Sequence, residues 1–502
     1  MAQSRYQGRA LDSPVGSGGL VAISVIAAIL CGAIAATGQI LFVVFLAGAI
    51  FSIFLIFQPV LLLQIATITT FVIAGTVKYF QPEFDRIWWL AYGMAALLYA
   101  PALMGLLSRR IKERVSGDSL TTVPLILVFC VIVASSVFSR PSAEQLIVSI
   151  KSLFLLGGIW ALLAYVPIAA QTVKTWLKGL LAIGLVQWLP AVYQYLFVRQ
   201  ARLAAHLGVI EASDSVVGTF GGSQESGGMT AVLALYLVAS IAVLIALRRH
   251  RITSRRLFLV VLAFLTIPLL LMEVKIVFVY LPVALIVLYR ESILRRPLSF
   301  IGTSAIGTIV LIGLIGAYQF LHWSAKSMDL QRNVEERFMY SFEAKAGPQA
   351  SRLGVMTRRE TLEFWWDRHG TTNLLQTMLG HGMGSSKTGG LVTGDVARRY
   401  APMHIDRLGL SSLLWDLGIL GVLAVLGLLA GAFFKAGRLA LNNSLESWQR
   451  GLASGLQAAV PLFALSIAYR NDIPYAAPMM FLLMTCFGLL AWLQRQAQKS
   501  IS

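Results

Sequence analysis

Residues 257–289 read LFLVVLAFLTIPLLLMEVKIVFVYLPVALIVLY, an apolar stretch interrupted only by Glu273 and Lys275. A membrane-spanning helix needs about 20 apolar residues, so this stretch is too long for one helix. Charged residues are costly inside a bilayer, and the two charges are therefore expected at a tight turn. The stretch predicts a hairpin of two helices within a membrane.

The whole chain has the composition of a membrane protein. Of its 502 residues, 57% are hydrophobic and 13% are charged, and the mean hydropathy is +0.75, too apolar for a water-soluble surface. Runs long enough to span begin near residues 19, 39, 59, 87, 122, 146, 174, 228, 257, 276, 299, 409, 451 and 474. We therefore predict an all-α polytopic membrane protein with about fourteen transmembrane helices in one domain.

The charge distribution predicts which side each loop faces. The net charge is +18, but most of the excess lies in short basic loops between apolar runs, as the positive-inside rule requires, and this argues against nucleic acid as a partner. With a cytosolic N-terminus, the clusters at residues 109–114, 248–256, 290–296, 435–450 and 495–499 all face the cytosol. All of these clusters face the same side only if residues 257–289 form two helices. Both termini are then expected in the cytosol.

This topology divides the chain into five segments. They are a cytosolic tail (1–18), a bundle of about eleven helices (19–320), a large outer loop (321–408), three further helices (409–494) and a cytosolic tail (495–502). Within the loop, helix-like stretches at Met328–Phe342 and Leu353–Arg368 precede a Gly-rich passage from Gly380 to Gly394. We expect the loop to be folded. The three cysteines lie in apolar runs without metal-ligand spacing, so disulfides and structural zinc are not indicated.

The outer segments contain residues suited to an anionic ligand. The loop arginines are Arg332, Arg337, Arg352, Arg358, Arg359, Arg368, Arg398, Arg399 and Arg407. Any one of them can instead pair with the acids that interleave with them, but as a group they suit a diphosphate at a membrane surface. Lys275 is a further candidate, with an interfacial turn as its alternative. Arg199 and Arg202 end another helix on this side and can equally snorkel to the headgroups.

Five of the six histidines, His206, His322, His369, His381 and His404, fall on the outer side. A histidine can act as a general base near neutral pH, although a surface role is the alternative for each one. No HExxH, Walker A, GxSxG or DxD-like pattern occurs in the outer segments, so neither a metal nor a cofactor is indicated.

Two stretches together resemble the superfamily of bacterial O-antigen ligases and O-antigen polymerases. The first is VVGTFGGSQESGGMTAVLALYLVASIAVL at 216–244, followed about fifty residues on by LLMEVKIVFVY. The second begins with SRLGVMTRRETLEFWW at residue 351 and continues through LGHGMGSS and HIDRLGLSSLLWDLGILGVLAVL to residue 426. The second resembles the family's order of an Arg, a Trp-containing helix, a GxG and a polar residue that enters the next helix.

The resemblance implies a GT-C-like architecture in the bacterial inner membrane and transfer of undecaprenyl-diphosphate-linked glycans on the periplasmic side. Basic residues would bind the diphosphate, and a loop His would activate the acceptor hydroxyl without a metal. Arg352 matches the Arg that opens the second motif, and Lys275 stands where the family usually has Ser-Arg. The family's His-Asn falls on Arg407 and Leu408, with His404 three residues earlier. The expected base is therefore His404, with His381 or Asp406 as alternatives. The expected diphosphate ligands are Arg352, Lys275, Arg199, Arg202, Arg407 and Arg358.

The favoured function is a surface-polysaccharide polymerase that inverts the anomeric configuration. Its expected partners are an undecaprenyl-diphosphate-linked glycan, an acceptor glycan, membrane lipids and a polysaccharide chain-length regulator. A ligase that uses lipid A core as acceptor is the first alternative. A flippase for lipid-linked oligosaccharides is the second, although flippases usually place charges within several helices.

Overall fold

The computed structural model describes residues 51–108, 119–199, 201, 216–223, 227–272, 274–295, 313, 316, 356–370, 372–389 and 392–499. The chain divides into two compact units, Met1–Leu62 and Leu63–Ser502, and the helices that position the candidate site belong to the second. The predicted helices near residues 19, 39 and 299, and the helix-like stretch Met328–Phe342, lie outside the described residues.

The described residues form helices, with one short β-ladder between β1 (Gly222–Ser223) and β2 (Gly227–Gly228). The first helical segments are α3 (Pro59–Ile68), η1 (Thr69–Ile73), α4 (Ala74–Phe80), η2 (Pro82–Ile87), α5 (Trp88–Leu97), α6 (Tyr99–Ser108), α7 (Ser119–Ser139), α8 (Ala143–Ile150), η3 (Lys151–Leu155), α9 (Gly157–Tyr165), α10 (Ala170–Val186), α11 (Trp188–Tyr193) and η4 (Gln194–Val198). They are followed by α13 (Thr230–Arg249), α14 (Arg255–Leu271), α15 (Val277–Arg295), α19 (Arg358–His369), α20 (Leu374–Leu379), α21 (Asp395–Arg399), α22 (Gly409–Ala440), α23 (Ser447–Tyr469), α24 (Asp472–Tyr475) and α25 (Ala477–Lys499).

The fold is that of a multi-pass membrane protein. Nine helices in the described part of the chain are long and apolar enough to cross a membrane. They are Pro59–Phe80, Pro82–Leu107, Leu120–Ser139, Ala143–Tyr165, Ala170–Val198, Thr230–Arg249, Gly409–Ala440, Ser447–Tyr469 and Ala477–Lys499. Where they fall on described residues, the predicted helix starts lie within about four residues of the observed ones. The last helix continues through part of the predicted tail to Lys499.

The stretch 257–289 splits into two helices, as predicted. α14 ends at Leu271 and α15 begins at Val277, so the chain leaves the helical conformation around Lys275. Both helices pack against α13, and α15 also packs against α23. The hairpin is therefore part of the bundle, because both of its helices share α13 as a neighbour.

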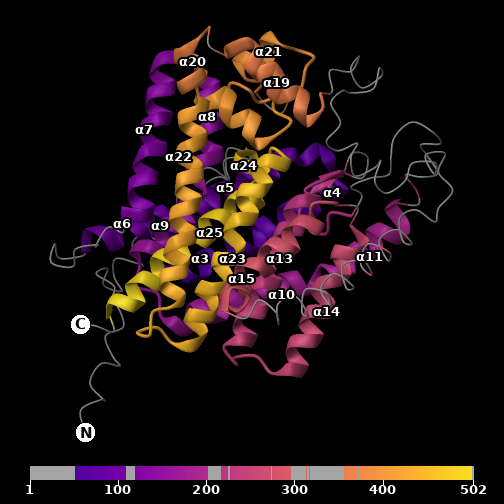
Figure 1. Ribbon diagram of the computed structural model, residues 1–502, viewed down its shortest axis with the longest axis vertical. Helices are drawn as coiled ribbons and strands as arrows, with labels where there is room; N and C mark the ends of the chain where they lie inside the picture. Colours follow the sequence, from indigo (N-terminus) through magenta and orange to yellow (C-terminus); the bar gives the residue numbers. More distant parts are fainter. Residues whose placement is uncertain are drawn as a thin grey trace, which may run out of the picture. The chain divides into compact units, whose positions relative to one another are not determined.

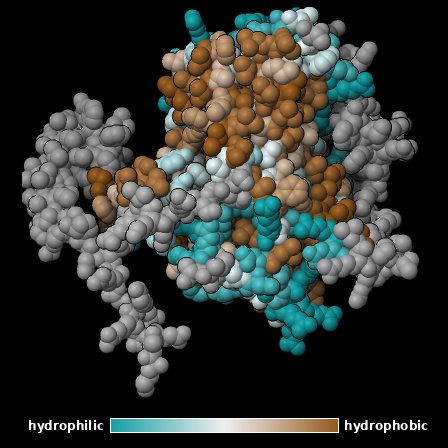
Figure 2. Space-filling view, turned by 60° about the vertical axis from the view of Figure 1, so that its left-hand side comes forward, coloured by the Kyte–Doolittle hydropathy of each residue, from teal (hydrophilic) through white to brown (hydrophobic). Residues whose placement is uncertain are grey.

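The described part of the large loop, from residue 356 onwards, and the described basic residues lie at opposite ends of this unit. At one end, Gly409 N donates to Arg470 O (2.9 Å), which ties the start of α22 to the end of α23, and α19, α20 and α21 gather here (Figure 1). At the other end, Arg249 donates to Leu288 O and Arg290 lies 5.8 Å from the ring of Phe433. We call these the loop end and the basic end. In Figure 2 an apolar face has hydrophilic residues gathered below it.

Small residues allow the helices to pack closely. A Cβ on Gly455 of α23 would lie 2.6 Å from the Cα of Val243 in α13, so only glycine fits at this crossing. Such small residues are typical of helix contacts in membranes, where close van der Waals packing replaces the hydrophobic effect. The α13–α23 contact therefore fixes part of the frame that supports the loop end.

Candidate functional site

The Gly-rich passage of the loop is fixed to α7 and α8. Ser135 of α7 accepts a hydrogen bond from Gly382 N (3.0 Å). Gln145 of α8 donates to Met383 O (2.9 Å) and accepts from Asp395 N (3.0 Å), so one buried amide side chain connects two parts of the loop. These contacts use groups that are far apart in the sequence, and they make the loop part of the membrane-embedded structure.

Asp416 of α22 forms the centre of this attachment. Its side chain is only 3% exposed, and its carboxylate accepts hydrogen bonds from Gly384 N (2.8 Å), Ser386 N (2.9 Å), the Ser385 hydroxyl (3.0 Å) and the Tyr475 hydroxyl (3.1 Å). A buried carboxylate is costly unless its oxygens accept several such bonds. We call Asp416 and these four donors the Asp416 knot.

A break in α22 prepares its backbone for the loop. Gly418 has φ 66° and ψ −167°, a conformation that favours glycine and interrupts the helix. The carbonyls before the break accept other donors: Trp415 O accepts from His381 N (2.8 Å) and Asp416 O accepts from the Ser135 hydroxyl (2.8 Å). The break therefore exchanges helical hydrogen bonds for bonds to the loop and α7.

A second buried carboxylate, Asp406, is connected to an exposed histidine through Thr388. Asp406 is 4% exposed; it accepts from Thr388 N (2.8 Å) and from the Thr388 hydroxyl. The same hydroxyl oxygen lies 3.2 Å from His404 Nδ1. Because the single hydroxyl hydrogen goes to Asp406, the oxygen accepts from Nδ1–H, and His404 Nε2 then carries the lone pair. We call this chain the His404 relay.

Burial and hydrogen bonding act on Asp406 in opposite directions. Desolvation raises the pKa of its carboxyl above the ordinary value, while the Thr388 hydrogen bonds and the positive charge of protonated His404 lower it. Asp406 and His404 are therefore connected through the Thr388 hydroxyl. This arrangement suits a base that must hold a proton during a reaction.

Two further histidines form a pair. His369 Nε2 lies 2.7 Å from His381 Nε2, and His369 Nδ1 lies 3.0 Å from Trp365 O. Since a carbonyl can only accept, Nδ1 of His369 carries the hydrogen and its Nε2 accepts from His381. Burial lowers the pKa of His381 to about 4, with smaller contributions from His369 and Arg399, and burial also lowers the pKa of His369. Both are neutral near pH 7.

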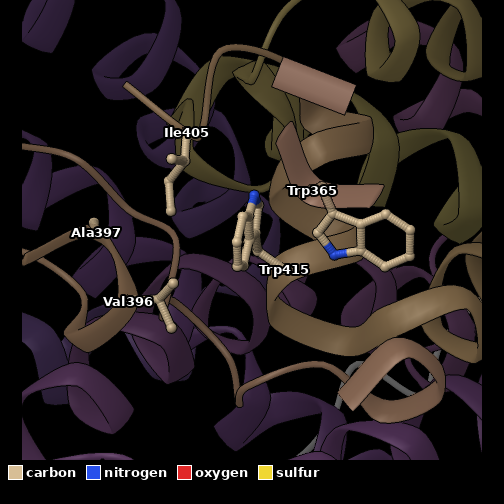
Figure 3. Close-up of a cluster of buried hydrophobic side chains, with 5 residues drawn as sticks. All are labelled: Trp365, Val396, Ala397, Ile405 and Trp415. Atoms are coloured by element: carbon tan, nitrogen blue, oxygen red, sulfur yellow. The ribbon is translucent and has the colours of Figure 1, made fainter. Parts of the chain in front are cut away.

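An apolar cluster holds the loop helices over the start of α22 (Figure 3). It consists of Trp365, Val396, Ala397, Ile405 and Trp415. Trp415 also lies 4.7 Å from the ring of His369, in an edge-on arrangement. The cluster therefore sets the positions of the histidine pair and of Asp406, the neighbour of Ile405.

Three cations lie close to aromatic rings around the turn after α23. Arg358 donates to Tyr469 O (3.0 Å), and its guanidinium lies 4.3 Å from the Tyr469 ring. Lys387 Nζ is 5.5 Å from the ring of Tyr475, and Lys151 Nζ is 4.9 Å from the ring of Tyr92. The Tyr92 hydroxyl in turn donates to Tyr475 O (3.4 Å). Positive charge therefore gathers around residues 469–475.

The structure brings some of the predicted residues together. His404 and Asp406 meet through Thr388, whereas His381 belongs to the histidine pair. Arg358 contacts the end of α23, and Arg407 is exposed beside Asp406.

Lys275 precedes α15, whose Tyr280 lies near Tyr469, so the turn at Lys275 belongs to the loop end. Arg199 is 4% exposed and lies 5.1 Å from the ring of Tyr195. Arg352, Arg202 and Glu273 lie outside the described residues.

Several site residues were not predicted from the sequence. They are Thr388, Asp416, Tyr475, Lys387 and Lys151. Lys151 carried a usable signal, because it is an ionisable residue inside an apolar run. In the structure it opens a π-helical segment, a feature frequent at functional sites. Asp416 carried the same signal within α22. Thr388 carried no such signal, because its role depends on the positions that Asp406 and His404 take in the folded structure.

No protein-family model matches the chain, and no curated protein matches it significantly. The resemblance to the O-antigen ligase and polymerase superfamily is therefore a hypothesis based on its motifs. Among the described residues, no three His, Cys, Asp or Glu side chains are placed to hold a metal ion.

Proposed function

We propose that this protein is a polysaccharide polymerase of the bacterial inner membrane, which transfers glycan from undecaprenyl diphosphate to an acceptor glycan at the periplasmic face. The observation that carries the proposal is the His404 relay, which leaves Nε2 of an exposed histidine as a base on the large loop. The nearby cations and the sequence motifs supply further support.

In the proposed reaction, the acceptor hydroxyl attacks the anomeric carbon of the lipid-linked sugar. His404 Nε2 removes the hydroxyl proton as the new C–O bond forms. The bond between the anomeric carbon and the phosphate oxygen breaks, and the diphosphate leaves with the electron pair. Attack from the opposite face inverts the anomeric configuration. Asp406 stabilises the resulting imidazolium through the Thr388 hydroxyl.

The leaving diphosphate needs fixed positive charge. Arg358 and Lys387, together with the turn at Lys275, provide it at the end of α23, and Arg352 adds to it in the motif-based assignment. Donors held in place before the reaction stabilise the charge that develops without reorganising, which is usually a large part of catalysis. In this role, Arg358 is favoured over a lysine because its guanidinium can bind two phosphate oxygens.

The test is chain growth by purified full-length protein in liposomes that contain a labelled undecaprenyl-diphosphate repeat unit. Products longer than one repeat on undecaprenyl diphosphate, without lipid A core, would support a polymerase. Transfer only after core is added would indicate the ligase alternative. Movement of the lipid across the bilayer without any transfer would contradict both and indicate a flippase.

Substitution of the base provides the residue-level test. His404→Gln should lower kcat by about 10²- to 10⁴-fold, the usual contribution of a general base. The matched control is His250→Gln, because His250 follows α13 at the basic end and should leave kcat unchanged. Equal activity of His404→Gln and wild type would reject the assignment of the base.

A further inference from the structure

A large cavity lies between α7, α9, α22 and α25, away from the His404 relay. Its volume is about 1100 Å³, above the usual range of about 300–1,000 Å³ for small-molecule sites. Most of its wall is apolar, including Phe129 of α7, Trp160 of α9, Leu428 of α22 and Met484 of α25. This lining suits hydrocarbon chains.

The cavity extends along the helices for about the thickness of a bilayer. Asp416 and Lys435 both line it and belong to α22. From Ile419, just after the break at Gly418, to Lys435 the helix rises roughly 24 Å at about 1.5 Å per residue, and Asp416 lies beyond the break, so the cavity approaches the hydrocarbon thickness of about 30 Å. The cavity therefore reaches from the loop end to the basic end.

The charged residues that line the two ends of the cavity differ in sign. Lys435, Arg495 and Lys499 line the basic end, and Asp416 is the one acidic residue among those that line the cavity. Lys435 is only 7% exposed, and its Nζ lies 3.4 Å from the Thr121 hydroxyl. Arg495 donates to Val166 O (2.9 Å). These contacts hold the two side chains at this end of the cavity.

We propose that the cavity binds one anionic diacyl phospholipid from the leaflet at the basic end. Its phosphate lies against Lys435, Arg495 and Lys499, and its acyl chains extend between α7 and α25 past Phe129 and Met484. A lipid in the opposite orientation would bring its phosphate to Asp416 and the apolar side chains around it. Charge complementarity thus fixes both the class of lipid and its direction.

Such a lipid would connect helices that are distant in the sequence. α7 packs against α22 and α9 packs against α25; all four helices line the cavity, so a bound lipid would contact both pairs. Because a ligand that binds only the folded state raises its stability, an anionic phospholipid should stabilise this unit. The inference does not depend on the glycan transferase activity.

The test is native mass spectrometry of the full-length protein after exchange into phosphatidylglycerol or phosphatidylcholine. One phosphatidylglycerol should be retained per chain, at least about tenfold more often than phosphatidylcholine. The triple variant Lys435→Gln, Arg495→Gln, Lys499→Gln should lose this preference. Equal retention of the two lipids by the wild type would overturn the proposal without any variant.

A matched control separates this site from general attraction to the membrane. Arg255, Arg256 and Arg438 are exposed cations at the basic end that do not line the cavity, and changing all three to Gln should leave the preference intact. Thermal stability should rise with phosphatidylglycerol and not with inorganic phosphate. A preference lost equally in the control variant, or the same rise with inorganic phosphate, would contradict a diacyl lipid in this cavity.

Discussion

The Asp416 knot and the His404 relay each contain a buried aspartate at the loop end, yet their surroundings differ. The oxygens of Asp416 accept from donors on the Gly-rich passage and from Tyr475. The oxygens of Asp406 accept from Thr388, whose hydroxyl leads to an exposed imidazole. A carboxylate enclosed by fixed donors holds structure together, whereas one with a connection to the surface can influence chemistry there.

The largest expected effect comes from breaking the Asp416 knot. Asp416→Ala leaves the N–H groups of Gly384 and Ser386 and the Tyr475 hydroxyl without their acceptor, so local stability should fall by about 3 to 5 kcal/mol. Hydrogen exchange at Gly384 and Ser386 measures this opening. Asp416→Asn keeps one acceptor oxygen, so its local stability should fall less than that of Asp416→Ala. Unchanged exchange in Asp416→Ala would show that the loop is held by other contacts.

Breaking the His404 relay should affect activity more than structure. Thr388→Ala removes the hydroxyl between Asp406 and His404 and should lower kcat by about 10- to 100-fold. This loss is smaller than the one expected when the base itself is removed, because His404 is still present. Thr388→Ser should restore most of kcat, because it keeps the hydroxyl. Exchange at Gly384 should stay as in wild type, and strong deprotection there would mean that Thr388 acts through the knot.

The histidine pair predicts a pH dependence of the loop. The pKa values of His369 and His381 are lowered in the folded loop. Between about pH 4 and the ordinary histidine pKa of about 6.5, the folded loop therefore binds fewer protons than the unfolded chain does. The loop should therefore have its full stability above this window and lose stability on acidification through it, by on the order of 3 kcal/mol for His381. Hydrogen exchange in α19 against pH checks this. His381→Gln should flatten the profile, and an unchanged slope would contradict the assignment.

The smallest expected effect concerns a surface ion pair of the same loop. Arg359 Nε and Glu363 Oε1 are 2.6 Å apart, but the two side chains are 64% and 51% exposed. Such exposed pairs on a helix contribute about 0.3 to 0.5 kcal/mol to stability. Arg359→Gln should leave loop stability and kcat almost unchanged in thermal and activity assays. A tenfold loss of activity would place Arg359 among the diphosphate ligands.

Several features of the fold could be predicted from local sequence. The predicted starts near residues 59, 257 and 409 agree with helices α3, α14 and α22, because about twenty apolar residues are a local signal. The Glu273 and Lys275 pair marked the break between α14 and α15. The start of α19 is also local, since Thr357 and Glu360 form a capping box.

The candidate site could be predicted only in part. His404 and Asp406 were named from the resemblance, but their connection through Thr388 was not. The pairing of His369 with His381 likewise depends on the positions of α19 and Trp415. Such contacts depend on the folded path of the chain, and no periodic pattern encodes them.

The sequence alone therefore determined that this chain is a multi-pass membrane protein, that residues 257–289 form two helices, and that one large loop is rich in arginine. Hydrophobic length and the cost of burying charge are local quantities, and they suffice for these conclusions. Only the tertiary structure decided which aspartate is enclosed by fixed donors and which is connected to a histidine. Hydrogen bonds between distant segments, such as that from Ser135 to Asp416, form only when the helices pack.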